Sequence, residues 1–252
     1  MGSGPVETNS SDSLRIDISD LGVSSSFDDG AKPADPEGKG RKKGIPSRIF
    51  RLLFLLLFLA VLPFFTLVRV SVFLFQAHGL SSWLALGCGA AATALLLVVY
   101  LVAVSVQFGG KGRVPRTFLK GVGVLVGAYC LFTLLYISGG NAKTPEIRDT
   151  YTSLNPLLRV GVSTLLLMDR DGVLTATGRT LQDYAAWGLA PNEASLHLPQ
   201  TDGFVYAVDI RTLGRPEWRN RVVGLYFRVM GFGTLRHTGT ADHLHVSLEP
   251  PA

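Results

Sequence analysis

Three long apolar stretches without a charged residue dominate the middle of the chain: Leu52–Val68, Trp83–Val106 and Gly121–Ile137. At 1.5 Å per residue, a helix of about 20 residues crosses a bilayer core of about 30 Å. Arg51 and Arg69 allow the first stretch to extend, because their long stems let the charged ends reach the interface. The pattern predicts three transmembrane helices, over about 49–68, 83–106 and 121–137. A re-entrant or tilted first segment is the alternative, because Pro63 lies within it.

The last part of the chain has mixed periodicity. Helical spacing predicts helices at Pro156–Met168, Leu181–Trp187 and Pro216–Met230. Short or alternating apolar runs predict strands at Val173–Thr177, Val205–Ile210 and His243–Leu248. The mixture favours an α+β domain with an antiparallel sheet over residues 154–252, joined to the last span by a linker at 139–153.

The first 48 residues are rich in Ser, Gly, Asp and Pro, and they contain few large apolar side chains. Such a segment buries too little surface to offset the entropy of ordering it. We therefore predict a disordered tail over residues 1–48.

The net charge of +5 first suggests a nucleic-acid partner, but its position excludes one. Residues 49–138 carry six Lys or Arg and no acidic residue, whereas residues 139–252 carry eleven basic and eleven acidic residues. The basic excess therefore belongs to the membrane region and not to a nucleic-acid-binding domain.

The basic residues also orient the chain in the bilayer. They gather before the first span and between the second and third spans: Arg41, Lys42, Lys43 and Arg48, then Lys111, Arg113, Arg116 and Lys120. Loops rich in Lys and Arg stay in the cytoplasm. We therefore predict a cytoplasmic amino terminus and a carboxy-terminal domain on the outer side. Both cysteines, Cys88 and Cys130, fall within spans, so the exported domain needs no disulfide.

Candidate chemistry gathers in the exported domain, which holds four of the five histidines: His197, His237, His243 and His245. Neutral imidazole is a common zinc ligand, and Asp can complete such a set. The chain contains no His-Glu-x-x-His, no Gly-x-Ser-x-Gly and no phosphate-binding glycine loop. These absences exclude the usual helix-borne zinc protease.

Three segments carry a family resemblance: Ser195-Leu196-His197, Ala207-Val208-Asp209-Ile210 and Asp242-His243-Leu244-His245. Over residues 154–249 their order and flanks resemble the zinc D-alanyl-D-alanine carboxypeptidase and dipeptidase family. That family shares a superfamily with lysostaphin-type enzymes and the hedgehog signalling domain. The resemblance implies a fold of that type, a Zn²⁺ cofactor held by His197, Asp209 and His245, and Asp242 as the catalytic base.

Two alternatives within the site stay open. The family's Asp commonly follows the first His by seven residues, but Asp209 follows His197 by twelve, so Asp202 is an alternative ligand. A regular strand turns His243 and His245 to one face and Asp242 to the other. Another branch of the superfamily uses His-x-His with the first His catalytic, which makes His243 the alternative general acid or base.

Arginine supplies the remaining element of the expected chemistry. Arg179 resembles the family's arginine ahead of the first ligand, where a positive group stabilises charge on the tetrahedral intermediate. We interpret Arg236 and His237 as residues of a solvated loop. The arginines at 215, 219, 221 and 228 are interpreted as a solvated helix face.

The residues together predict a multi-pass zinc metallopeptidase of a bacterial inner membrane that hydrolyses peptidoglycan peptides near D-alanine. The rival hypothesis is a non-catalytic zinc-binding or peptidoglycan-recognition module on a membrane anchor. The expected partners are the bilayer and cell-wall peptides, and the spans offer a surface for a membrane protein partner. The spans lack acidic and paired polar residues, which argues against an ion pathway.

Overall fold

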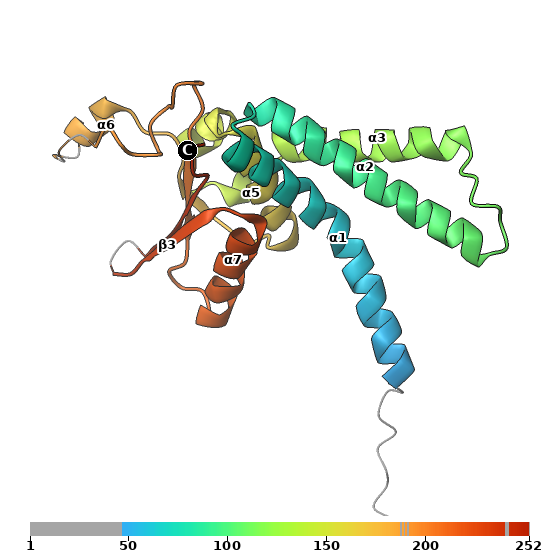
Figure 1. The fold of residues 1–252 in the computed structure, drawn as a ribbon. Helices are drawn as coiled ribbons and strands as arrows, with labels where there is room; N and C mark the ends of the chain where they lie inside the picture. Colours follow the sequence, from blue (N-terminus) through green and yellow to red (C-terminus); the bar gives the residue numbers. More distant parts are fainter. Residues whose placement is uncertain (1–46, 187, 189, 191, 240–241, 252) are drawn as a thin grey trace, which may run out of the picture. The chain divides into compact units, whose positions relative to one another are not determined.

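The computed structural model describes residues 47–251, except 187, 189, 191, 240 and 241 (Figure 1). The predicted disordered tail lies outside the described residues up to position 46, and the first helix begins at Ser47.

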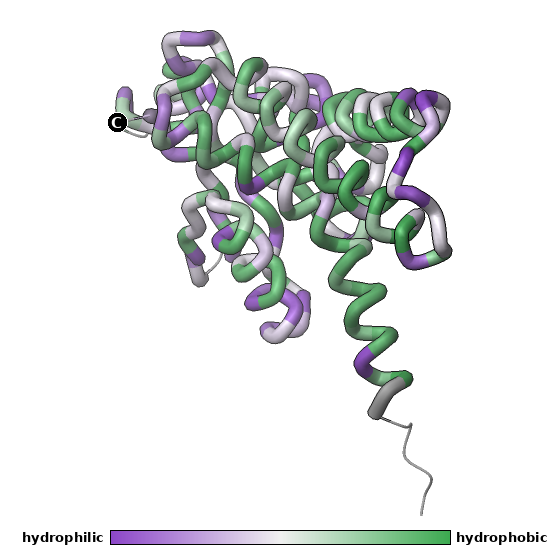
Figure 2. Tube along the Cα trace, turned by 45° about the vertical axis from the view of Figure 1, so that its right-hand side comes forward, coloured by the Kyte–Doolittle hydropathy of each residue, from purple (hydrophilic) through white to green (hydrophobic). Residues whose placement is uncertain are grey.

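Three long helices follow one another: α1 (Ser47–His78), α2 (Ser82–Gln107) and α3 (Arg116–Leu135). Each is long and apolar enough to cross a membrane, which confirms the three predicted spans. Figure 2 shows the hydrophobic character that runs along α1. Helix α1 continues through Pro63 without a break, so the first span is a continuous helix and not a re-entrant segment.

Helix α1 is longer than its predicted span, which ended near Val68. Its 32 residues extend about 48 Å, well beyond a bilayer core of about 30 Å. The extra turns pack on the carboxy-terminal domain: Val72 and Phe75 are buried, and the Phe75 ring lies 5.8 Å from the ring of Tyr206. This apolar packing explains why the helix continues after the charge of Arg69.

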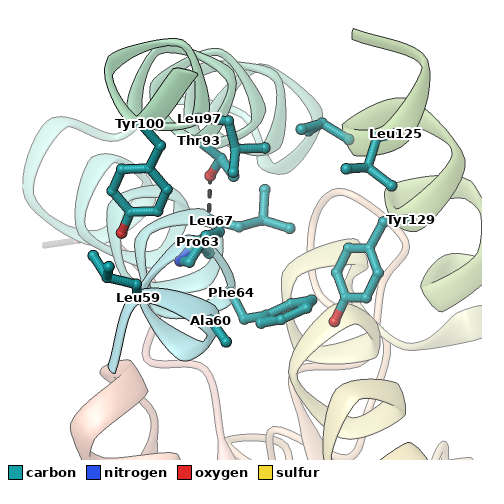
Figure 3. A pocket seen from close by; sticks show the side chains of 11 residues that line it. Leu59, Ala60, Pro63, Phe64, Leu67, Thr93, Leu97, Tyr100, Leu125 and Tyr129 are labelled. Atoms are coloured by element: carbon teal, nitrogen blue, oxygen red, sulfur yellow. Dashed lines mark hydrogen bonds between the residues drawn. The ribbon is translucent and has the colours of Figure 1, made fainter. Parts of the chain in front are cut away.

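The three spans enclose an apolar cavity of about 300 Å³ (Figure 3). The rings of Phe64 on α1 and Tyr129 on α3 meet edge to face at one side of it, with centroids 5.0 Å apart. The hydroxyl of Thr93 on α2 donates to the carbonyl of Pro63 across 3.4 Å. Because its lining is almost wholly apolar, this cavity belongs to the packing of the spans and offers nothing to polar chemistry.

The rest of the chain forms an α+β domain with one antiparallel sheet in the order β1-β2-β4-β3, which confirms the predicted class. Its strands are β1 (Leu174–Ala176), β2 (Ala207–Arg211), β3 (Gly233–His237) and β4 (His243–Ser247). Its main helices are α5 (Pro156–Met168), α6 (Leu181–Ala186) and α7 (Glu217–Met230). Strand β3 was not predicted, and it contains Arg236 and His237, which were expected in a loop.

The predicted linker at 139–153 consists of three short helical segments: η1 (Gly139–Asn141), α4 (Pro145–Asp149) and η2 (Thr150–Ser153). Asn141 and Tyr151 are buried, and the amide of Lys143 donates to the carbonyl of Leu174 in β1. These residues therefore belong to the folded domain, and little chain separates it from the last span.

Helix α5 connects the spans to the domain, and eleven of its thirteen residues are buried. It contacts α1, α2 and α3 on one side and α7 on another. A helix that is apolar all round is stable only when it is covered all round. The domain is therefore seated directly on the spans.

Two polar side chains at the amino-terminal end of α5 bond to the spans. Asn155 caps the helix by accepting from the amide of Leu157 at 3.0 Å, and its Nδ2 donates to Ser82 at the start of α2 across 2.6 Å. The guanidinium of Arg159 donates to the carbonyl of Leu134, near the end of α3. Each bond satisfies a group that burial at a helix end would otherwise leave unpaired.

One face of the sheet is covered by helices, and the other face carries the candidate site residues. Val208 and Ile210 of β2 pair with Val246 and Leu244 of β4, and these four residues form part of the core beneath α5 and α7. The alternate positions, Asp209 on β2 and His243 and His245 on β4, point to the other face. The candidate site therefore lies on the side of the sheet opposite to the spans.

We expect Asn155→Ala to lower the free energy of unfolding by about 1–3 kcal/mol, because it removes a helix cap and a buried hydrogen bond to α2. Ser82→Ala removes only the second of these and should cost less. Urea titration of the full chain in detergent micelles measures both effects, with the exposed Asn192→Ala as control. Equal stability of Asn155→Ala and Asn192→Ala would contradict this account of the junction.

Candidate metal centre

Two neighbouring strands and one loop bring the three predicted ligands together. Asp209 and His245 lie directly opposite each other in the antiparallel pair of β2 and β4. His197 lies in the loop before β2, which is held in place because the amide of Tyr206 donates to the carbonyl of Leu196. The ladder therefore places two of the three residues, and the loop adds the third.

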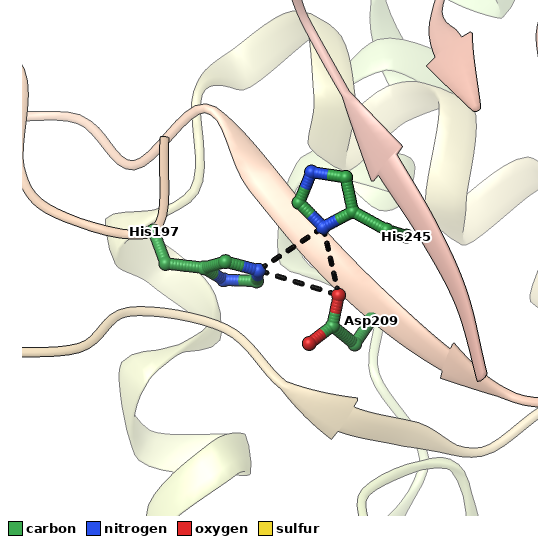
Figure 4. A group of neighbouring side chains, drawn as sticks. All are labelled: His197, Asp209 and His245. Carbon is green, nitrogen blue, oxygen red and sulfur yellow. Dashed lines mark hydrogen bonds and ion pairs between the residues drawn. The ribbon is translucent and has the colours of Figure 1, made fainter. Parts of the chain in front are cut away.

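The three side chains point toward one another (Figure 4). The Oδ1 atom of Asp209 lies 2.9 Å from Nδ1 of His245 and 3.3 Å from Nε2 of His197. The two ring nitrogens are 3.3 Å apart. Four-coordinate metal sites with bonds of about 2.0–2.1 Å place neighbouring donor atoms about 3.3 Å apart. His197, Asp209 and His245 could therefore hold a metal ion.

The second nitrogen of His197 is fixed by the backbone. Its Nδ1 lies 2.7 Å from the carbonyl oxygen of Thr177, where it acts as the donor. The lone pair of a neutral ring is then left on Nε2, which faces Asp209 and His245. Metal-bound histidines usually have such a partner on the other nitrogen, which orients the ring and raises its basicity.

Asp209 is the electrostatic centre of the cluster, and only 3% of it is exposed. Burial alone would raise its pKa, but hydrogen bonds with His197 and His245 and nearby positive charge outweigh burial and hold that pKa well below its ordinary value. The side chain is therefore a carboxylate at neutral pH, the form that binds a metal ion.

Arg179 and His243 contact the other carboxylate oxygen of Asp209. Nη2 of Arg179 donates to Oδ2 of Asp209 at 2.9 Å, and Nε2 of His243 lies 3.8 Å from the same oxygen. Both side chains are about one quarter exposed. Arg179 and His243 therefore adjoin the three ligands and also face solvent.

Two cavities adjoin the site and share Lys143, Thr175, Ala176 and Arg179. One, of about 380 Å³, is lined by Asp209, Asp242 and His243, and the other, of about 560 Å³, extends along α4. Together they are large enough for an extended peptide or a comparable ligand beside the three candidate metal ligands.

Asp242, the predicted base, lines the cavity of about 380 Å³ but is not one of the three clustered ligands, and its carboxylate is engaged by other partners. Its carboxylate accepts from Nε of Arg236 at 2.7 Å, from Nη2 of the same guanidinium at 2.8 Å and from the hydroxyl of Thr212 at 2.8 Å. Arg236 also pairs with Glu217 of α7, on the covered side of the sheet. The regular alternation of β4 produces this outcome, since it separates Asp242 from His243 and His245.

Asp202, the alternative ligand, lies in a turn outside the cluster. Its carboxylate accepts from the amide of Phe204 and from the hydroxyl of Tyr206. The additional residues between His197 and Asp209 therefore form a loop with its own hydrogen bonds. Asp209 keeps the position opposite His245.

Several contacts of the site were not predicted from the sequence. The stacking of His237 on His243, at 4.7 Å between ring centroids, and the pairing of Arg236 with Asp242 both require β3. The short run after Gly231-Phe232-Gly233, facing His243–Leu248 across turn-forming residues, was the available hairpin signal. The contact between His197 and Thr177 uses the backbone carbonyl of Thr177, so the residue type at position 177 gave no indication of it.

Comparison of the chain with models of protein families, with curated proteins and with solved structures finds no match.

We expect the full chain to bind about one divalent metal ion per molecule. His197→Ala, Asp209→Ala and His245→Ala should each weaken binding by more than the roughly 10–100-fold that loss of an outer-shell partner costs. Elemental analysis of the purified, dialysed protein measures the metal content. His237→Ala, a histidine on the adjacent strand, is the matched control and should keep the metal. Equal metal content in His245→Ala and His237→Ala would contradict the assignment.

The ion pair of Asp242 should give the domain a pH-dependent stability. Hydrogen bonds from Arg236 and Thr212 lower the pKa of Asp242 below its ordinary value of about 3.9. The stabilisation is therefore complete above the unfolded-state pKa and is lost as pH falls through the lower folded-state pKa. Asp242→Asn should lower the thermal unfolding midpoint at pH 7, and the difference from the parent chain should vanish in acid. Asp149→Asn, which also removes one exposed carboxylate, is the control for the change in net charge.

Proposed function

We propose that this chain is a membrane-anchored zinc peptidase, with a domain of the D-Ala-D-Ala peptidase and hedgehog type, that hydrolyses peptidoglycan peptides near D-alanine. The observation that carries the proposal is the meeting of His197, Asp209 and His245 at the spacing of a four-coordinate metal site. Two imidazoles and one carboxylate suit zinc, and three protein ligands leave a position for water or substrate. A zinc ion bound in this way lowers the pKa of its water to about 7 and polarises a carbonyl.

His243 is the residue best placed to move a proton. It lies on the same face of β4 as His245, and it lines the cavity of about 380 Å³. Its ring can take a proton from an attacking water and return it to the leaving amine. Asp242 serves the fold instead, because its carboxylate is engaged by Arg236 and Thr212.

Arg179 supports two tasks. By donating to Oδ2 of Asp209 it holds the carboxylate so that Oδ1 faces the two histidines. It also lines both cavities, where its charge stabilises the oxyanion that forms when a peptide carbonyl is attacked. Lys143 and Arg211 add positive charge to the first cavity, which suits peptides that carry carboxylates.

Localisation follows from the charge bias of the loops around the spans. Lys and Arg gather before α1 and between α2 and α3, which supports a cytoplasmic amino terminus and an outward-facing domain. A bacterial inner membrane is the setting in which such a domain meets the cell wall.

A non-catalytic zinc-binding or peptidoglycan-recognition module is the second candidate. The specific observation in its favour is the engagement of Asp242, since the carboxylate that the resemblance assigns as base is paired with Arg236 and is not among the three clustered ligands. Activity of the full chain distinguishes the two functions.

We expect the purified full chain, loaded with zinc, to release peptides or D-alanine from peptidoglycan fragments, as followed by mass spectrometry. His243→Gln should keep its zinc and lose about 10²–10⁴-fold in rate, because it removes a general acid–base group. Asp242→Asn should keep both zinc and most of the activity, with reduced stability. Zinc binding without cleavage by the parent chain would favour the recognition module. Loss of activity in Asp242→Asn with an intact fold would return the role of base to Asp242.

A further inference from the structure

The outer face of α7 carries a continuous apolar stripe. Trp218, Val222, Leu225 and Val229 are 68%, 55%, 55% and 49% exposed. At 100° per residue these four positions lie within about 60° of one another on the helix. The opposite side of α7 carries Val223 and Phe227, which are buried in the core. Single exposed apolar residues need no explanation, but an aligned row of this length indicates a surface that is covered.

The order of the layers in the fold indicates which way the apolar stripe of α7 faces. Helices α5 and α7 lie on the same side of the sheet and are joined by the hydroxyl of Tyr226, which donates to the carbonyl of Gly161 across 2.8 Å. The other side of α5 is covered by α1, α2 and α3. Helix α7 also contacts α1, the first of the three spans (Figure 1). In a bilayer crossed by the spans, the side of α7 that faces away from the sheet would therefore be the side nearer to the membrane.

The end of α7 also lies at the level where α1 leaves the bilayer. Arg69 is the first charge after the apolar run that begins at Leu52, so it marks the interface on the domain side. Arg69 and Val72 pack closely on Gly231, which ends α7 with a φ of 99°. The carboxy-terminal end of α7 is thus fixed beside the headgroup region.

The composition of the stripe suits that region. Trp is enriched at membrane interfaces, where its ring packs on acyl chains and its N–H meets headgroups. Arg221 and Arg228 are exposed along one border of the stripe and can reach lipid phosphates while their stems lie on apolar surface.

We propose that the stripe formed by Trp218, Val222, Leu225 and Val229 lies on the headgroup region of the leaflet nearest to the domain. Helix α7 is then an interfacial amphipathic helix that holds the domain on the bilayer in addition to the three spans. This inference does not depend on zinc or on catalysis.

Spin labels in the full chain, reconstituted into nanodiscs of phosphatidylcholine and phosphatidylglycerol, test the proposal. Single cysteines are placed at Val222 or Leu225 in a Cys88→Ala, Cys130→Ala background, and collisions with oxygen and with a water-soluble nickel chelate are measured. We expect several-fold fewer collisions with nickel than at the matched control Leu235→Cys. Leu235 is also exposed and apolar, but it lies on the face of the sheet that carries the metal centre.

Equal nickel accessibility at positions 222 and 235 would overturn the proposal. Dipolar broadening between labels at position 222 would also overturn it, because it would show that a second copy covers the stripe. The native Trp218 gives an independent reading without a label. Brominated lipids should quench the fluorescence of the parent chain more than that of Trp218→Phe, and equal quenching would count against the contact.

Discussion

The burial of α5 on all sides is the constraint on which the rest of the structure depends. A helix that presents apolar side chains in every direction is stable only when each side is covered, and two different layers divide this task. The sheet and α7 cover one part, and the three long helices cover the other. Asn155 and Arg159 then supply the hydrogen bonds that this close contact between helix ends requires. The anchor and the domain consequently share a single hydrophobic core.

The alternation of the strands divides the charges of the domain between two networks. On the outward face, Asp209 balances the positive groups around it and gathers His197 and His245. On the covered face, Asp242 and Arg236 form an ion pair that joins β3 to the start of β4. Asp242 and His243 are adjacent in the sequence, yet they belong to different networks. An acid beside a histidine motif need not take part in its chemistry.

Much of this arrangement could be predicted, for identifiable physical reasons. The spans produce long apolar runs and α5 a helical periodicity, and the family resemblance of the segments around His197, Asp209 and His245 implied the cluster. The sequence allowed the first span to extend past Arg69, but its end at His78 depends on packing against the domain through Val72 and Phe75. Strand β3 was missed because it is short and follows a glycine-rich break. The engagement of Asp242 depends on β3, and so it was missed for the same reason.

The absence of a free linker between α3 and the domain, in the part of the chain that the structure describes, has a consequence for reach. A domain on a flexible tether samples a volume set by the length of its tether, whereas here the three candidate metal ligands stand at a height set by the thickness of a sheet and a helix layer. The fold thus acts as a spacer of constant length. Any polymer that the site recognises has to pass at that one distance from the bilayer, and polymer nearer or farther away is left untouched.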